Sequence, residues 1–539
     1  MIRTKVLVVG GGPGGYVAAI RAGHLGLDTV LVEANRLGGT CLIRGCIPSK
    51  ALIHAAGKFD DMRRAFGDGI IGITLREAPS IDLNRTMLWK EGIVDRLSGG
   101  VGVLLRKANV RVLEGWATFS DAKTCTVRTG EAEEMIRAEH VILANGSNPA
   151  ALPGLEFGGP VISSTEALAL DRVPERLLVV GAGYIGLELG TAFRKLGSEV
   201  TIIEALERIL PNWDEPLTNP VRRWLERAGV TLHLGATVEM VERREGAAEA
   251  RVRTEDGVTL PVAADQVLVT VGRKPLTQGW GLEAIAVDMA GPFVRIDERC
   301  RTSMRDVWAI GDLVGEPMLA HKASAQGEMV AELIGGARRQ FDPVAIPAVC
   351  FTDPEIVSIG LSPGDAGARV ADLIVTQFPF AANGRALSME AGEDSGFVRV
   401  VARSDDHRVL GVQAVGAHVA ELIGEFTLAI EMGALLEDVA GTIHAHPTLT
   451  EASICWPACW RAGCLQRAYP SHATEQDDAT TELTVAGGPR VRIRLPPAES
   501  LLRTSLSAHG WPHRSRFRNR ELKVRIHLPP AVSQMRTLT

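Results

Sequence analysis

Short apolar runs alternate with longer segments of helical periodicity through the first half of the chain. Residues 5–9 (KVLVV) and 29–32 (TVLV) flank a helix-like segment over 16–24, and residues 177–180 (LLVV) and 200–203 (VTII) flank a second one. Continuous apolar runs of this length are typical of parallel strands that helices cover on both faces. The pattern therefore predicts an α/β protein with repeated strand–helix–strand units.

Each unit carries a GxGxxG motif after its first strand and a glutamate at the end of its second strand. The residues are Gly10, Gly12, Gly15 and Glu33 in the first unit and Gly181, Gly183, Gly186 and Glu204 in the second. In both units the glutamate lies 18 positions after the third glycine, and the second unit follows the first by 171 positions.

A dinucleotide site needs these residue types at this spacing. The first glycine makes a tight turn, the second lets pyrophosphate approach the backbone, the third lets helix pack on strand, and the carboxylate accepts hydrogen bonds from a ribose. One such motif is a weak signal, but two copies in the same context predict two dinucleotide sites. Glu204 would repel a 2′-phosphate, so we expect NAD and not NADP at the second site, although Arg208 lies nearby.

Three other apolar strands end in glycine turns. Residues 141–147 turn at Gly146 and are suited to a domain crossover, and residues 267–273 repeat that pattern at Gly272. Residues 307–312 end in Gly311 and Asp312. A Gly–Asp pair alone is usually only a turn signal, but in a flavin protein the aspartate can bind ribitol hydroxyls.

Cys41 and Cys46 lie five positions apart in the run GGTCLIRGCIPSK over 38–50. A regular helix would hold their Cα atoms roughly 8–9 Å apart, whereas a disulfide needs about 5.5–6 Å. A bond between them requires a distorted backbone, which Gly45 and Pro48 permit. The two residues are then either a strained, redox-active pair or two unrelated buried thiols.

Composition limits the classes of function. The 539 residues are 46% hydrophobic and 23% charged with a formal net charge of −6, which indicates three or four globular domains and disfavours nucleic acid as a partner. The first strand begins almost at Met1 and no apolar run reaches about 18 residues, so we expect neither a leader peptide nor a membrane span. We expect a cytoplasmic protein whose eight cysteines form no disulfide framework.

Together these residues resemble the pyridine nucleotide–disulfide oxidoreductases, and most closely their dihydrolipoamide dehydrogenase branch. The resemblance rests on GGTCLIRGCIPSK, the two GxGxxG units, VWAIGD (307–312) and HAHPTLTE (444–451), and it runs from about residue 3 to about residue 452. The strings MLAHKASAQGE (318–328) and QFPFAANGRA (377–386) further resemble the variants of branched-chain 2-oxoacid dehydrogenase complexes.

The resemblance implies an α/β protein with two Rossmann-like dinucleotide-binding domains and an α+β dimerisation domain. The expected order is an FAD-binding domain over 1–147, an NAD-binding domain over 148–273, a central segment over 274–343 that completes the FAD domain, and the dimerisation domain over 344–452. The residues expected to contact a cofactor are Gly10, Gly12, Gly15, Glu33, Lys50, Gly146, Gly311, Asp312 and Ala320 for FAD, and Gly181, Gly183, Gly186, Glu204 and Gly272 for NAD. No metal site is expected.

The same resemblance implies the chemistry of the cysteines. Cys41 would exchange with dihydrolipoamide carried by a lipoyl-bearing acyltransferase, and Cys46 would lie against the flavin. Lys50, one helical turn beyond Cys46, would pair with Glu188 near the flavin and favour its reduced form. Tyr184 would cover the flavin on the NAD side or serve as a core aromatic.

His446 is the expected acid–base residue, because thiol exchange requires a group that takes and returns protons near neutral pH. Glu451 would orient its imidazole, and His444 would be supporting or structural. In the family this histidine reaches the cysteines of the other subunit, which implies a homodimer. The histidine motif alone does not exclude a structural role.

Other readings remain open at this point. Glutathione reductase would need NADP, which Glu204 disfavours. Mercuric reductase would need two adjacent cysteines near the end of the chain, and this sequence has none. Soluble transhydrogenase lacks the first cysteine of the pair, which is present here as Cys41. A different class is a catalytically impaired FAD-binding subunit whose dimer is spoiled by its tail.

Residues 453–539 depart from the family pattern. They carry twelve Arg and one Lys against six Asp plus Glu, a net charge of +7, and Pro457 stands where a terminal helix is expected. We expect a disordered appendage or a shifted reading frame; an Arg-rich docking segment or a redox extension is the alternative. The alternation at 490–494 (RVRIR) is typical of a strand.

Overall fold

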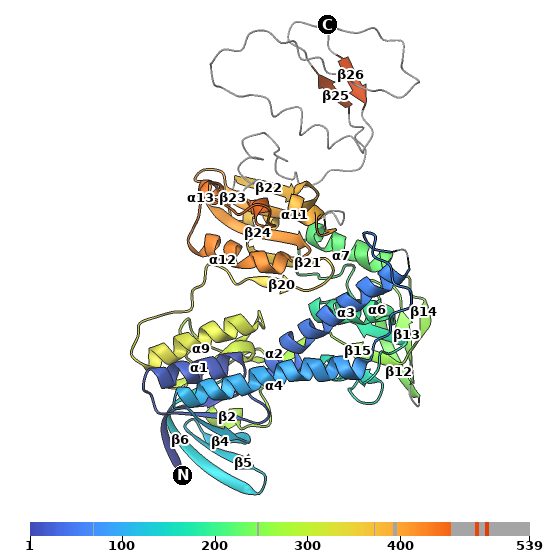
Figure 1. Ribbon diagram of the computed structural model, residues 1–539. Helices are drawn as coiled ribbons and strands as arrows, with labels where there is room; N and C mark the ends of the chain where they lie inside the picture. Colours follow the sequence, from blue (N-terminus) through green and yellow to red (C-terminus); the bar gives the residue numbers. More distant parts are fainter. Residues whose placement is uncertain are drawn as a thin grey trace, which may run out of the picture. The chain divides into compact units, whose positions relative to one another are not determined.

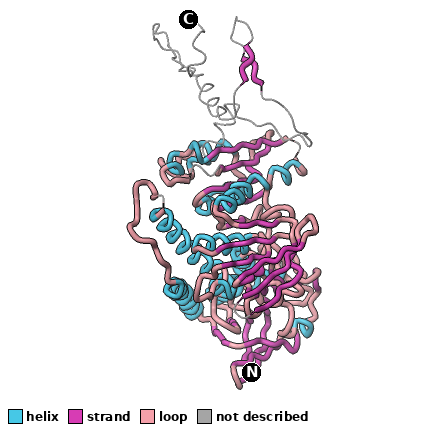
Figure 2. The backbone as a smooth tube through the Cα atoms, turned by 90° about the vertical axis from the view of Figure 1, so that its right-hand side faces the viewer, coloured by secondary structure: helices cyan, strands magenta, loops and turns pink. Residues whose placement is uncertain are grey.

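The computed structural model describes residues 1–453 except 68, 245–246, 371 and 392–395, and beyond them only 480–483 and 491–494. Four sheets with their covering helices make up most of the described part, and strand and helix alternate as the apolar runs predict (Figures 1 and 2). The fold is mixed α/β.

The first sheet has the order β3-β2-β1-β6-β5-β4, with β19 paired to β6. Strands β3, β2, β1, β6 and β19 are parallel, whereas β4, β5 and β6 form an antiparallel meander. The strands are β1 (Ile2–Val9), β2 (Thr29–Glu33), β3 (Arg111–Glu114), β4 (Trp116–Asp121), β5 (Thr124–Thr129), β6 (Ala132–Leu143) and β19 (Val307–Ala309).

Successive residues of β1 alternate between two hydrophobic clusters, as the period of a strand requires. Val6 and Val8 pack with residues of three helices, whereas Leu7 and Val9 pack against the antiparallel meander. The three helices, which Figure 1 shows beside one another, are α1 (Pro13–His24), α4 (Leu83–Lys107) and α9 (Ala320–Ile334). Because β19 and α9 follow the second unit in sequence, the chain returns to complete the first sheet after building the second.

The second sheet is wholly parallel, in the order β11-β10-β9-β15-β8. Its strands are β8 (Val161–Ile162), β9 (Arg176–Val180), β10 (Glu199–Ile203), β11 (Thr231–His233) and β15 (Gln266–Val269), and its helices are α5 (Ser164–Ala167), α6 (Tyr184–Leu196) and α7 (Glu215–Arg227). An antiparallel sheet of β12 (Thr237–Arg244), β13 (Ala247–Arg253) and β14 (Thr259–Ala264) accompanies it.

Short elements connect the two units. β7 (Ser147–Pro149) pairs with β16 (Arg273–Pro275), so the two glycine turns at Gly146 and Gly272 lead into one crossover ribbon. The return segment contains α8 (Leu282–Ile285), β17 (Met289–Ala290), β18 (Phe293–Val294) and the 3₁₀-helix η1 (Gly311–Val314).

The last large sheet is antiparallel, in the order β20-β21-β24-β23-β22. Its strands are β20 (Ala348–Cys350), β21 (Glu355–Gly360), β22 (Leu373–Pro379), β23 (Phe397–Arg403) and β24 (Val409–Gly416). Its helices are α10 (Pro363–Gly367), η2 (Phe380–Ala382), α11 (Gly384–Leu387), η3 (Val419–Leu422), α12 (Ile423–Glu431) and α13 (Leu436–Gly441).

The tail contributes one described hairpin. β25 (Thr480–Leu483) pairs antiparallel with β26 (Val491–Arg494), which is the strand that the alternation at 490–494 indicates. We also expect the tail to be disordered or read in a shifted frame. This expectation concerns residues of 453–539 that lie outside the described part of the chain.

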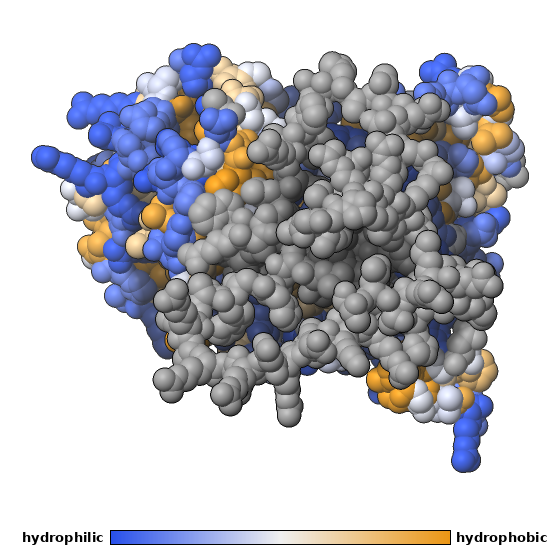
Figure 3. Space-filling model, turned by 90° about the horizontal axis from the view of Figure 1, so that it is seen from above, coloured by the Kyte–Doolittle hydropathy of each residue, from blue (hydrophilic) through white to orange (hydrophobic). Residues whose placement is uncertain are grey.

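Within the described part, no helix is both long and apolar enough to span a membrane. On the coloured part of the face in Figure 3, hydrophilic residues surround smaller hydrophobic patches.

Candidate active site

The two GxGxxG turns have the same geometry. Gly10 and Gly181 both adopt φ = +103°, a conformation that favours glycine. A Cβ on the third glycine would lie 1.7 Å from the Gly10 oxygen in the first unit and 2.1 Å from the Gly181 oxygen in the second. Gly15 and Gly186 therefore serve helix–strand packing, whereas Gly12 and Gly183 cap the helices α1 and α6 at the open side of the turn.

The two glutamates are held in matching positions. Glu33 accepts hydrogen bonds from the backbone N–H of Gly11 (2.6 Å) and Asn35 (2.8 Å). Glu204 accepts them from Ala182 (2.7 Å) and Leu206 (2.9 Å), 171 positions later in each case. Backbone hydrogen bonds thus fix the two carboxylates at the ends of β2 and β10.

Two cavities lie at these turns. The first, of about 400 Å³, is lined by Gly10, Gly12, Glu33, Cys41, Cys46, Lys50, Gly146, Gly311, Asp312 and Ala320 among others. The second, of about 1470 Å³, is lined by Gly181, Gly183, Glu204, Arg208 and Gly272 among others. Every expected cofactor residue lines its cavity except Gly15 and Gly186, the two packing glycines.

Tyr184 lines both cavities and is 41% exposed, so the interpretation of this residue as a core aromatic is wrong. It begins α6 directly after the second glycine turn. Partial desolvation against the cavity walls raises the pKa of Tyr184 to about 12. Tyr184 therefore lies where the first cavity and the second come together.

The backbone between the cysteines is broken at Gly45. Helix α2 (Gly39–Arg44) ends there and α3 (Cys46–Phe66) begins, with Gly45 at φ = −145° and ψ = −110°. A Cβ at Gly45 would lie 2.9 Å from the Thr40 oxygen. Pro48 lies in the first turn of α3, where its missing N–H costs no hydrogen bond, so the proline is compatible with a helix that starts afresh at Cys46.

The side chains of Cys41 and Cys46 lie within hydrogen-bond reach of each other. A hydrogen bond from the Cys41 thiol, together with the charge of Lys50, lowers the pKa of Cys46 to about 7. The same hydrogen bond to Cys46, with burial, raises the pKa of Cys41. Cys46 is therefore the more acidic thiol of the reduced pair.

Lys50 is held by two groups from distant parts of the chain. Its Nζ atom lies 2.8 Å from Glu188 Oε2, the pair that the resemblance implies, and 4.4 Å from the centre of the Phe351 ring. The second oxygen of Glu188 accepts the backbone N–H of Phe351 at 3.0 Å. Glu188 is buried, so these two donors stabilise its negative charge.

We expect Lys50→Met to raise the pKa of Cys46, because the ammonium stabilises the thiolate. Reduced protein should form its thiolate near pH 7, and the variant should form it about one pH unit higher or more. The measurement is a pH titration of ultraviolet thiolate absorbance against a Cys46→Ser blank. Lys58→Met, which removes an exposed lysine from the same helix, is the control; equal midpoints in both variants would contradict the assignment.

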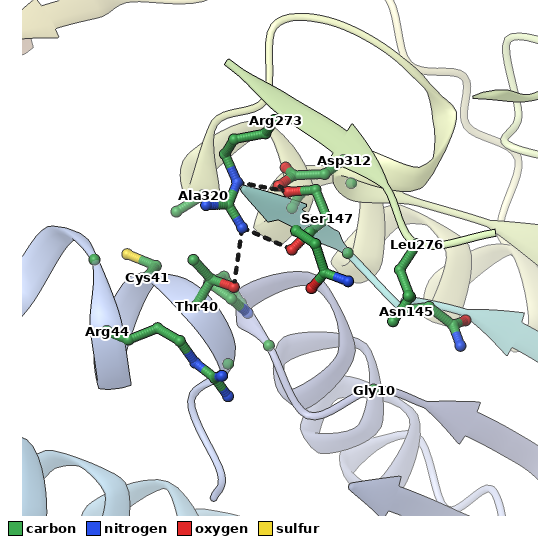
Figure 4. A pocket seen from close by; sticks show the side chains of 18 of the residues that line it. Gly10, Thr40, Cys41, Arg44, Asn145, Ser147, Arg273, Leu276, Asp312 and Ala320 are labelled. Carbon is green, nitrogen blue, oxygen red and sulfur yellow. Dashed lines mark hydrogen bonds between the residues drawn. The ribbon is translucent and has the colours of Figure 1, made fainter. Parts of the chain in front are cut away.

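Arg273 is a site residue that the sequence alone did not single out. Its guanidinium donates to Ser147 Oγ (2.8 Å) and the Ser147 carbonyl (2.6 Å) and reaches Thr40 Oγ1 (3.5 Å), while Ser147 donates to Asp312 (2.5 Å) (Figure 4). Arg273 lines both cavities. Its position after the Gly272 turn was the available signal, but its partners lie more than 120 positions away.

His446 and Glu451 line neither cavity. His446 Nδ1 lies 2.8 Å from Glu451 Oε1, and Thr448 N–H donates to Glu451 Oε2 at 2.9 Å. These two hydrogen bonds, the backbone one first, lower the pKa of Glu451. The pair is formed, with the imidazole 80% exposed, but within one chain it is not joined to the cavity of Cys41.

Comparison with known proteins assigns the chain to a protein family. The family model of pyridine nucleotide–disulphide oxidoreductases matches residues 4–327, and that of the dimerisation domain of the same family matches 346–454. The chain belongs to the pyridine nucleotide–disulphide oxidoreductases.

Individual family members support the same placement. The chain is 59% identical to the dihydrolipoyl dehydrogenase of Pseudomonas aeruginosa over 84% of this chain and 96% of that one, and 42% identical to that of Geobacillus stearothermophilus over 84% and 95%. Among solved structures, LpdA of Mycobacterium tuberculosis superposes with a TM-score of 0.77 at 26% identity over 86% of this chain and 99% of that one.

Two further residues that line the first cavity have polar side-chain atoms without a hydrogen-bond partner in the described structure. Asn145 Oδ1 and Arg44 Nε are buried and have no hydrogen-bond partner within the described structure. Buried polar atoms rarely stay unpaired. These two atoms are thus unsatisfied polar groups beside the first cavity.

Proposed function

We propose that the chain is a dihydrolipoyl dehydrogenase that works as a homodimer, oxidises dihydrolipoamide through Cys41, Cys46 and FAD, and reduces NAD. The observation that carries the proposal is that Cys41 and Cys46 lie in the wall of one nucleotide cavity, and that Tyr184 lines both this cavity and a second one. An electron pair can thus enter at a dithiol and leave at a pyridine nucleotide without crossing the protein.

The first cavity fits FAD. Its turn leaves the backbone of Gly10 and Gly12 open to a pyrophosphate, Glu33 ends β2 as a ribose acceptor, and Asp312 can accept from ribitol hydroxyls. The unpaired atoms of Asn145 and Arg44 lie in the same wall. Bound FAD supplies a two-electron carrier between the dithiol and NAD.

The chain's own residues then handle the thiols. In the oxidised pair, a dihydrolipoamide thiol loses its proton to His446 Nε2 and attacks the Cys41 sulfur, so that Cys46 leaves as a thiolate. The second substrate thiol attacks the substrate sulfur of the mixed disulfide, lipoamide leaves, and Cys41 takes a proton from His446. Two electrons are then on the dithiol, and the proton of the second thiol passes to solvent.

The low pKa of Cys46 suits its part in this sequence. A thiolate stabilised by the Cys41 thiol and Lys50 is a good leaving group, whereas Cys41, whose pKa is raised, is readily reprotonated. Glu451 holds His446 Nδ1 and leaves Nε2 to face the substrate.

Glu204 is proposed to select NAD. We expect Glu204→Gln, which removes the charge and keeps one acceptor, to lower kcat/KM for NAD about tenfold, the worth of a charge-assisted hydrogen bond, and to raise the ratio of NADP to NAD use. Steady-state assays with both coenzymes measure this. Glu199→Gln, an exposed residue of the same strand, should change neither; an unaltered ratio in Glu204→Gln would exclude the selection role.

We also propose the domain boundaries, the partner protein and the cellular compartment. We assign 1–147 and 274–343 to FAD binding, 148–273 to NAD binding and 344–452 to dimerisation, with a lipoyl-bearing acyltransferase of a 2-oxoacid dehydrogenase complex as the partner, in the cytoplasm. The match of the family's dimerisation domain to residues 346–454 supports the last boundary.

The test is dihydrolipoamide-dependent NAD reduction by the purified full-length chain, with NADP beside it. Activity with NAD supports the proposal. A chain that binds FAD but is inactive and monomeric would instead be the impaired subunit, and repeating the assay on residues 1–453 would show whether the tail is the cause.

A further inference from the structure

The segment that carries His446 has no regular structure of its own. Residues 442–450 belong to neither a helix nor a strand, and several of their side chains, including those of Ile443 and His446, are exposed. The direction of the imidazole therefore depends on Glu451 and on whatever fixes this loop.

Asn383 holds the loop after the histidine. Its side chain is buried at 4% exposure between η2 and α11. Its Oδ1 accepts the N–H of Ala386 at 2.9 Å, which caps α11, and its Nδ2 donates to the Thr448 carbonyl at 3.1 Å. The N–H of the same Thr448 donates to Glu451, so the amide of Asn383 supports the group that orients His446.

His444 holds the loop before the histidine. Its side chain is only 6% exposed, its Nε2 lies 2.7 Å from Glu425 Oε1 of α12, and its Nδ1 lies 2.9 Å from the Thr442 carbonyl. Both contacts are made within the same domain as Asn383, on the opposite side of His446 in the chain.

We propose that Asn383 and His444 are positioning residues that clamp the loop on either side of His446 and so fix the imidazole for proton transfer to a thiol. The inference rests on the proposed role of His446. The clamp assigns a role in catalysis to the motif QFPFAANGRA. The side-chain amide of its asparagine, Asn383, caps α11 and also binds the loop that carries His446.

Asn383→Asp separates the two functions of this amide. Aspartate is an equally good N-cap, so α11 keeps its cap, but the donor to Thr448 is replaced by an oxygen that faces a carbonyl. We expect kcat for dihydrolipoamide oxidation to fall about tenfold, because small displacements of a catalytic group cost this much or more. NADH-driven dye reduction, which does not require His446, should keep its wild-type rate, as should FAD content and dimer mass.

Double variants make the test specific. In a His446→Gln background, Asn383→Asp should cause no further loss, because the clamp acts only through His446. Wild-type rates of dihydrolipoamide oxidation in Asn383→Asp, an equal loss of dye reduction, or full additivity with His446→Gln would each overturn the clamp. Asp82→Ala, which removes the cap of α4, is the control for cap loss alone. If the wild-type chain itself fails to oxidise dihydrolipoamide, the proposed function is wrong. If the wild-type chain is active and Asn383→Asp is equally active, the function stands and only the clamp is wrong.

Discussion

Dihydrolipoamide oxidation should be lost, by about 10³-fold or more, when Cys41 is replaced by serine. The serine hydroxyl cannot form the mixed disulfide, and the hydrogen bond that lowers the pKa of Cys46 changes its donor. FAD should stay bound, because Cys41 is one of many residues that line its cavity. Lipoamide-linked turnover and the flavin absorbance of the purified variant are the measurements.

A matched substitution separates chemistry from folding. Cys125→Ser makes the same atomic change in a hydrophobic cluster of the first sheet. Cys125 lines neither of the two cavities. Turnover per bound flavin should be unchanged in this control. Normal lipoamide turnover in Cys41→Ser would remove the thiol scheme altogether.

The repeated unit could be read from sequence because its determinants are local. The glycines, the strands and the glutamate of each copy lie within about 30 residues, and the offset of 171 positions reappears in the backbone hydrogen bonds to Glu33 and Glu204. Glu188 and Lys50 could be paired in advance only through the family resemblance, since 138 positions separate them.

Residues that act across the fold left no local signal. Arg273 meets Ser147 and Thr40 only because the chain crosses between the two units twice. Phe351 reaches Lys50 from the start of the antiparallel sheet, and Asn383 reaches Thr448 across 65 positions. A short motif indicates which chemistry is present, but the residues that orient it are chosen by long-range topology.

Replacing His446 by glutamine should slow dihydrolipoamide oxidation by about 10²–10⁴-fold, the usual worth of a general acid–base group. NADH-driven dye reduction should persist, because that half of the cycle needs no proton transfer to a substrate thiol. His407→Gln is the control, since this histidine also contacts a glutamate of the same domain, Glu437, and lines neither cavity. Parallel loss of both activities in His446→Gln would indicate a role in folding.

Mixing the two inactive variants decides whether the site spans two subunits. A heterodimer of Cys41→Ser and His446→Gln chains has one site with both substitutions and one with neither, provided that each histidine serves the partner's cysteines. Random exchange of equal amounts should then restore about a quarter of wild-type activity, because half of the dimers are mixed and each has one intact site. If the histidine instead serves its own chain, every site carries one substitution and no activity returns, so the exposed position of His446 outside both cavities would need another explanation.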